Sequence, residues 1–336
     1  MTLAYELDYA WRSLRLGRNF LTGGTIHCNL QLTYRCNLSC RICDFWKAEH
    51  HDALDLDGVR TIARRLRQLG SVIVSCAGGE PLLRADLEDC IAALAGQGHF
   101  PILITNGWFV DAARARSVWE AGLQEISVSV DYREPARHDA MRGKDGCWQR
   151  AVEALRLLLA ARPDARRRVH LIAVLMDDNL NEIEPLVRLA EELGVTSMVN
   201  LYSPNRGAKA SRIPDGSAGK QLLEIKRRHP GLVTLTSYIE RFDQAIAEGG
   251  IGDCRAGRLF FNIGPNGDVH RCTEMTDRPL GNLLREDMRT VRDRLHAAAR
   301  QPCSACWTSC RGFAESMFRP PRSRQLKEFL NSVRPR

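Results

Sequence analysis

The chain has 336 residues, of which 44% are hydrophobic and 26% charged, the mixture of an ordinary globular protein. No run of about 18 apolar residues is present, and charged residues stand near the N-terminus where a signal peptide would be apolar, which argues against a membrane span and against secretion. Of the net charge of +8, residues 319–336 carry +5 (six Lys or Arg and one Glu), so we expect a solvated basic tail rather than a nucleic-acid-binding face.

From residue 28 to about 201, short apolar runs of strand type alternate with segments of helical period. The strand candidates are residues 28–33, 71–76, 101–105, 125–131, 169–175 and 195–201. The helix candidates between them include residues 57–69, 85–95, 111–121, 148–160 and 179–193. The candidate strands are near-continuous Val/Ile/Leu runs, typical of strands buried on both faces. Six βα units in series predict a parallel sheet, either a barrel or part of one.

The pattern changes after this repeat. Residues 207–219 are rich in Gly, Ser, Pro and Lys and are interpreted as a connection, followed by a helix to about residue 228. A hairpin is predicted from strands at 258–263 and 268–272, followed by another helix. We therefore expect an N-terminal extension (1–27), a core (28–210), a connecting helical segment (211–253), a small cysteine-bearing domain (254–318) and the basic tail (319–336).

Twelve cysteines are present, and their clustering argues against a disulfide framework in a protein expected in the reducing cytoplasm. Thiolate ligation of metal explains the clusters better. Four cysteines stand apart, and for each we expect a buried apolar position: Cys28, Cys76, Cys90 and Cys147.

Cys36-x3-Cys40-x2-Cys43 places three thiols within eight residues, directly after the first predicted strand. A four-iron cluster normally takes four cysteines, so three leave one iron with an open position where a substrate can coordinate. The alternative is a zinc site, but a structural zinc ion needs a closed set of four ligands.

This triplet, after a strand that ends in Leu32-Thr33, resembles the signature of the radical S-adenosylmethionine (SAM) superfamily. The resemblance implies a partial (β/α)6 TIM-like barrel, a [4Fe-4S] cluster on Cys36, Cys40 and Cys43, and SAM bound to the open iron. The residue before the last cysteine is usually aromatic in the family and is Ile42 here, so Phe45 and Trp46 are expected to supply an aromatic surface instead.

The same resemblance extends to residues at the carboxyl ends of later strands, where active sites of parallel sheets lie. Ala77-Gly78-Gly79-Glu80-Pro81 resembles the family's Gly-Gly-Glu motif, which implies that the two glycines approach the methionine end of SAM and that Glu80 accepts from its ammonium group. Further expected SAM contacts are Ser129, Asp131, Arg142 and Asn179. Without that role, Asp131 would be a turn residue, Arg142 part of a surface ion pair and Asn179 a helix N-cap.

A second pattern, Cys254-x12-Gly267-x4-Cys272 followed by Cys303-x2-Cys306-x3-Cys310, resembles the family's C-terminal auxiliary-cluster domains, called SPASM or twitch. Two clusters would need seven or eight thiolates, so we expect one auxiliary [4Fe-4S] cluster on Cys254, Cys272, Cys303 and Cys306, with Cys310 as a spare or alternate ligand. Because all its irons would be ligated, electron transfer is the expected role, and a structural zinc ion is the alternative.

The resemblance implies reductive cleavage of SAM and hydrogen abstraction from a peptide or small-molecule substrate, with a reductant such as flavodoxin or ferredoxin as partner. Only 27 residues precede the first predicted strand, so no fused leader-binding domain is expected. Molybdopterin-precursor synthesis is disfavoured because its family ends in a glycine-rich tail. The alternative from another class is a non-catalytic iron–sulfur or zinc protein that binds RNA through its basic tail.

Overall fold

The computed structural model describes residues 3–48, 54–70, 72–204, 212–318, 323 and 325–328, and the side chains from residue 6 onward. Residues 207–211 of the predicted connection at 207–219, and most of the basic tail at 319–336, therefore lie outside the described residues. No helix among the described residues is long and apolar enough to cross a membrane.

A nine-stranded sheet in the order β6-β5-β4-β3-β2-β1-β7-β8-β9 forms the body of the protein. Its first six strands are parallel neighbours in sequence order, β1 (His27–Thr33), β2 (Ile73–Gly78), β3 (Phe100–Thr105), β4 (Glu125–Ser129), β5 (Arg168–Leu175) and β6 (Thr196–Leu201). The other edge of β1 pairs with β7, so β6 and β1 do not meet and the strands form an open arc. The expectation of a partial (β/α)6 TIM-like barrel is confirmed.

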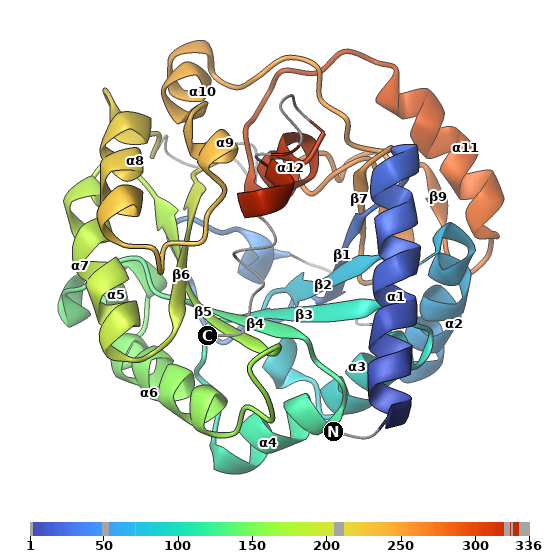
Figure 1. Cartoon of the computed structure of the whole chain (residues 1–336), viewed down its shortest axis with the longest axis horizontal. Helices are drawn as coiled ribbons and strands as arrows, with labels where there is room; N and C mark the ends of the chain where they lie inside the picture. Colours follow the sequence, from blue (N-terminus) through green and yellow to red (C-terminus); the bar gives the residue numbers. More distant parts are fainter. Residues whose placement is uncertain are drawn as a thin grey trace.

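Helices surround this arc as an outer layer (Figure 1). Those that connect the first six strands are α2 (Leu56–Leu66), α3 (Leu87–Gly96), α4 (Ala112–Glu120), α5 (Pro135–Arg142), α6 (Cys147–Ala160) and α7 (Leu180–Glu192). Helix α2 illustrates why they form: Asp55 caps its first turn by accepting from the Gly58 N–H, and its buried stripe is Val59, Ile62 and Leu66. All seven residues of β1 are buried, as expected for a strand covered on both faces.

The predicted C-terminal hairpin is present, since β7 (Phe260–Ile263) and β8 (Asp268–His270) pair antiparallel, and β9 (Gly281–Asn282) extends them. The sequence did not indicate that β7 also pairs with β1 in parallel, with His27 opposite Phe260. The second cysteine region is therefore built onto the edge of the same sheet. The remaining helices are α1 (Leu3–Thr22), α8 (Ala218–Arg228), α9 (Thr236–Ile239), α10 (Phe242–Glu248), α11 (Met288–Ala299) and α12 (Ser309–Ser316).

Helix α12 lies on the open side of the arc, between α9 and β7 (Figure 1). The Tyr238 hydroxyl accepts from the Leu201 N–H at the end of β6 and lies 3.3 Å from the Trp307 carbonyl oxygen, while the Trp307 indole donates to the Tyr238 carbonyl. On its other side, α12 brings the Cys310 sulfur within 3.4 Å of Asn29 Nδ2 on β1. The segment that carries the last cysteines thus bridges the gap between β6 and β1.

Candidate functional site

The loop after β1 carries the first three cysteines. Cys36, Cys40 and Cys43 belong to one apolar cluster, together with Leu38, Ile42, Trp108 and Cys147. Burial raises the pKa of Cys36 to about 12, and burial also raises the pKa of Cys40 despite the nearby Arg142 guanidinium. The thiols of Cys36 and Cys40 are therefore protonated in the metal-free protein, and metal binding would release their protons.

The Gly-Gly-Glu turn after β2 supports this cysteine loop through the backbone. The Gly79 N–H donates to the Thr33 carbonyl at 2.7 Å, and the Glu80 N–H donates to the Arg35 carbonyl at 2.8 Å. A Cβ on Gly78 would lie 2.0 Å from the Thr33 carbonyl oxygen, and one on Gly79 would lie 2.1 Å from that of Arg35. Glycine is therefore required at positions 78 and 79, because a side chain there would keep the turn from approaching the backbone of Thr33 and Arg35. The sequence did not reveal this structural role.

Glu80 is 1% exposed and joins the ends of β2 and β3. Its Oε1 accepts from the Leu82 N–H and the Thr105 hydroxyl, and its Oε2 accepts from the Asn106 N–H at 2.8 Å. Burial raises the pKa of this carboxyl group, while the three hydrogen bonds oppose that rise. Among the described residues Oε2 accepts a single hydrogen bond, so it retains capacity for a further donor.

Asp131 lies two residues beyond the end of β4, rather than within a strand that reaches residue 131. Its side chain is fully buried, and its oxygens accept from Arg142 at 2.5 Å and from the Val174 N–H at 2.9 Å. The Arg142 pair is therefore a buried one, not the surface ion pair that was the alternative expectation. Ser129, the last residue of β4, is half-buried.

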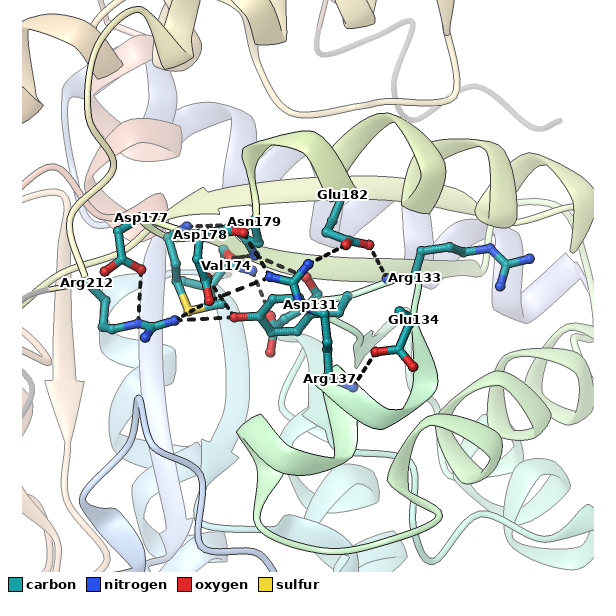
Figure 2. Close-up of polar contacts among 12 residues, drawn as sticks. Asp131, Arg133, Glu134, Arg137, Val174, Asp177, Asp178, Asn179, Glu182 and Arg212 are labelled. Atoms are coloured by element: carbon teal, nitrogen blue, oxygen red, sulfur yellow. Dashed lines mark hydrogen bonds and ion pairs between the residues drawn. The ribbon is translucent and has the colours of Figure 1, made fainter.

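Asn179 precedes α7 but does not cap it with its side chain. Its Oδ1 accepts from the Met176 N–H, and its Nδ2 donates to the carbonyls of Asp131 and Val174. Asn179 is fully buried and fastens the end of β4 to the end of β5 (Figure 2). The same view shows Arg212 at Asp177 and Asp178, where it holds the chain that returns after residue 211 against the β5 end.

Two buried donors near the cysteine loop have no partner among the described residues, Arg142 Nε and Asn37 Nδ2. Arg142 Nη1 lies 3.9 Å from Cys40 Sγ. Three thiols beside two unsatisfied donors fit a group that needs thiolate ligands and also accepts hydrogen bonds, which describes an iron–sulfur cluster with a polar ligand on it. Asn37 was missed by sequence reasoning, although its place between two ligand candidates was a signal.

No three His, Cys, Asp or Glu side chains in the described parts of the chain converge as ligands of a single metal ion. This does not conflict with a cluster, because the thiolates of a four-iron cluster bind different iron atoms and need not converge on one point.

An apolar wall adjoins the cysteine loop at Ile42. It consists of Tyr132, Met141, Met176 and Tyr202, with Ile213 packed against them. Phe45 instead stacks on Tyr34 at 4.9 Å, and Trp46 donates to the Cys40 carbonyl, so neither forms this wall. Tyr202 was missed by sequence reasoning, yet it directly follows β6, the position where such a residue should have been sought.

The second cysteine set lies where two chain segments run side by side, residues 250–256 and 301–306. The Cys254 N–H donates to the Cys303 carbonyl at 3.4 Å, and the Ile251 N–H donates to the Cys306 carbonyl. The Cys272 and Cys306 thiols lie close enough to interact electrostatically with each other and with Cys254. Burial raises the pKa of Cys272 and of Cys306 to about 12 each, and it also raises that of Cys254.

Two buried arginines hold these segments together. Arg271 donates to the carbonyls of Cys254, Ala256 and Gln301. Arg311 is fully buried and donates to the carbonyls of Ile251, Gly252 and Cys306, while its Nε pairs with Glu315 at 2.8 Å. The four thiols are thus brought together by the protein itself, with two cations beside them.

Cys310 faces another way. The Cys310 sulfur lies beside Asn29 on β1, and a negative charge on Cys310 would raise the pKa of Cys28 in the same strand. The isolated cysteines Cys28, Cys76, Cys90 and Cys147 are all buried, as expected. Burial raises the pKa of Cys147 to about 11, so its position at the start of α6 does not make it a thiolate.

The two cysteine regions are linked at the rim. Ser203, after β6, donates to Glu274 at 2.7 Å, and Glu274 lies two residues after Cys272. A small cavity beside this link is lined by Tyr202, Ser203, Ile213, Cys306 and Trp307, among others.

Comparison with known proteins places this geometry in context. Over 189 residues the chain is 26% identical to the AdoMet-dependent heme synthase of Nitratidesulfovibrio vulgaris. The aligned residues make up 54% of this chain and 50% of the relative, so the chain spans about half the length of that protein. It is 25% identical to the PqqA peptide cyclase of Xanthomonas campestris pv. campestris over 84% of this chain and 81% of the relative.

Among solved structures, Streptococcus suis SuiB bound to precursor peptide SuiA superposes with a TM-score of 0.69 at 16% identity, covering 86% of this chain and 70% of that chain. SuiB bound to S-adenosylmethionine superposes with a TM-score of 0.67, covering 83% of this chain and 68% of that chain. At this identity the likeness establishes the fold. Residues 30–190 match the family model of the radical SAM superfamily, so this part of the chain is a radical SAM domain.

Proposed function

We propose that this protein is an enzyme that uses SAM and a [4Fe-4S] cluster on Cys36, Cys40 and Cys43 to abstract a hydrogen atom from its substrate. When bound, the reduced cluster and SAM supply a 5′-deoxyadenosyl radical, which is the chemistry of the superfamily. The observation that carries the proposal is the set of three clustered thiols, Cys40 buried and the other two partly buried, beside the unpartnered donors Arg142 Nε and Asn37 Nδ2.

The chain's own residues would bind and orient the cofactor. Glu80, with an oxygen free to accept a further hydrogen bond, suits the ammonium group of SAM. Arg142 can direct its unpartnered Nε at a carboxylate while Asp131 keeps its charge compensated. Gly78, Gly79 and Asn179 act by positioning the cysteine loop and the ends of β4 and β5, and Ser129 remains a proposed contact at the rim. The wall beside Ile42 would exclude water.

For the second set we propose an auxiliary [4Fe-4S] cluster on Cys254, Cys272, Cys303 and Cys306, with a role in electron transfer. The close approach of these four residues and the separate direction of Cys310 support this ligand set. We also propose a division into a core at 28–210, a connecting segment at 211–253 and a cysteine-bearing part at 254–318. The first cysteine set lies in the core, and the second lies in the cysteine-bearing part.

A peptide is the substrate class that the comparisons favour. SuiB has been solved with its precursor peptide, and a PqqA peptide cyclase matches most of this chain. We also propose that the protein works in the cytoplasm with a reductant such as flavodoxin or ferredoxin, since all twelve cysteines are free thiols.

The test is formation of 5′-deoxyadenosine from SAM by anaerobically reconstituted protein with dithionite. We expect 5′-deoxyadenosine from the native protein and none from a Cys36→Ala/Cys40→Ala/Cys43→Ala variant. Cys272→Ala should retain this SAM cleavage, because it leaves the first cysteine set intact. Absence of 5′-deoxyadenosine from the native, iron-loaded protein would refute the proposal.

A further inference from the structure

The cysteine loop is thinly covered on one side. Ser39 and Arg41 are exposed, although Cys40 between them is only 8% exposed. The end of α5 and the residue after it lie directly against this stretch. The Arg41 N–H donates to the Met141 carbonyl at 3.0 Å, and a Cβ on Gly143 would lie 2.3 Å from Ser39 Oγ. The residues around the Arg41–Met141 and Ser39–Gly143 contacts therefore form the protein surface nearest to the exposed side of the cysteine loop.

Trp108, after β3, forms part of that surface. Its ring is only half-buried and packs in the same apolar cluster as the three cysteines. Two cations lie over the ring, with Lys144 Nζ at 3.8 Å and Arg150 Cζ at 5.6 Å from its centroid. Neither cation forms an ion pair with a carboxylate in the part of the chain that the structure describes.

The charge of this surface is positive overall. Exposed Arg41, whose backbone contacts Met141, adds to Lys144 and Arg150, which makes three cations. The nearby acids are Asp139 and Asp145. Both oxygens of Asp139 accept backbone N–H groups, from Gly146 and Trp148, so this carboxylate is directed into the protein at the start of α6.

We infer that the surface of Arg41, Trp108, Lys144 and Arg150 is where an acidic one-electron carrier protein docks to reduce the first cluster. The inference rests on the proposed function. One electron would leave the carrier, which is oxidised, and enter the cluster, which is reduced, with no atom transferred. A cationic surface with an aromatic residue at its centre suits an acidic partner, since complementary charge accelerates association and aromatic side chains are enriched at interface centres.

The experiment compares two reductants. Reduced flavodoxin, an acidic flavoprotein, must dock, whereas dithionite is a small molecule that need not. Lys144→Glu/Arg150→Glu reverses the charge beside Trp108, and Lys220→Glu/Arg227→Glu is the matched control because it reverses one lysine and one arginine on the exposed face of α8.

With dithionite, all three proteins should form 5′-deoxyadenosine at the same rate. With flavodoxin at low ionic strength, the Lys144/Arg150 variant should be slower by about tenfold, and the deficit should shrink as salt screens the charges. The control should match the native protein. An equal flavodoxin-driven rate in all three proteins would overturn the inference, as would a matching loss with dithionite, which would mean that the charges act on the site itself. If the native protein formed no 5′-deoxyadenosine with dithionite, the proposed function would fail first.

Discussion

Arg142 and Asp131 form a buried ion pair, with 2.5 Å between Nη2 and Oδ2. Burial alone would lower the pKa of Arg142, but the Asp131 and Cys40 charges outweigh it and raise that pKa. Removal of one partner leaves an uncompensated buried charge, so we expect Asp131→Ala to lower the free energy of unfolding of the metal-free protein by about 3–5 kcal/mol. Arg142→Met added to it should restore part of the loss. Denaturant titrations of the two single variants and the double variant would show this, and strictly additive losses would mean that the pair is not coupled.

Gly79 offers a test of the contact between the Gly-Gly-Glu turn and the cysteine loop. A Cβ there would lie 2.1 Å from the Arg35 carbonyl oxygen, so Gly79→Ala must push the loop away. We expect the reconstituted variant to lose about four of about eight irons and all SAM cleavage, because only the first cysteine set is displaced. Gly96→Ala is the control, since nothing lies within 4 Å of a Cβ at that helical position. Normal iron content in Gly79→Ala would show that the loop adapts.

Arg311 should determine whether the second cysteine set can hold a cluster. Arg311→Met leaves three backbone carbonyls and Glu315 without their partner, so residues 250–256 and 301–306 should separate. The iron content should fall by about four atoms per chain, while 5′-deoxyadenosine formation persists. Arg311→Lys should retain part of the second cluster because it keeps the charge. Arg289→Met, an exposed arginine on α11, should lose none. Iron analysis after gel filtration is the measurement, and full iron content in Arg311→Met would contradict the account.

His99 predicts how stability depends on pH. Burial lowers its pKa to about 4, below the ordinary value of 6.5 that the unfolded chain should show. The unfolded state therefore binds more protons between these values, so the contribution of neutral His99 is complete above pH 6.5 and is lost as pH falls toward 4. Two and a half pKa units correspond to about 3 kcal/mol at the lower end.

The comparison variant for this pH effect is His99→Gln. Glutamine can still donate to the Ala63 carbonyl, which the His99 Nε2 contacts at 3.0 Å, but it cannot take up a proton. Unfolding free energies of the two metal-free proteins should converge as pH falls from 6.5 to 4. Parallel pH profiles would show that His99 does not titrate in this range.

The repeating part of the fold could be predicted from local pattern. The first and third strands start within one residue of their predicted positions, and α6 starts one residue before its predicted one. The pairing of β7 with β1 could not be predicted, because it joins residues more than 200 positions apart and leaves no periodic signal. Helix α1 was assigned only as an extension, although Leu16 and Asn19 anchor it in the core.

The candidate site was also predicted only in part from the sequence. The cysteine spacing indicated both metal-binding regions, because ligand spacing is a local property. The contacts of Glu80, Asp131 and Asn179 with neighbouring strand ends depend on tertiary structure and were not foreseen. Arg271 and Arg311 were passed over because charged residues are rarely fully buried, and their partners are backbone carbonyls that any sequence supplies.

Iron and acid-labile sulfide counted per chain after anaerobic reconstitution test most directly the claim that two cysteine sets hold two clusters. The native protein should carry about eight irons, and the Cys36→Ala/Cys40→Ala/Cys43→Ala variant about four, with iron–sulfur absorption in both. A variant with Cys254, Cys272, Cys303 and Cys306 all changed to Ala should also carry about four. Stoichiometric zinc without iron–sulfur absorption at either set would contradict the account for that set.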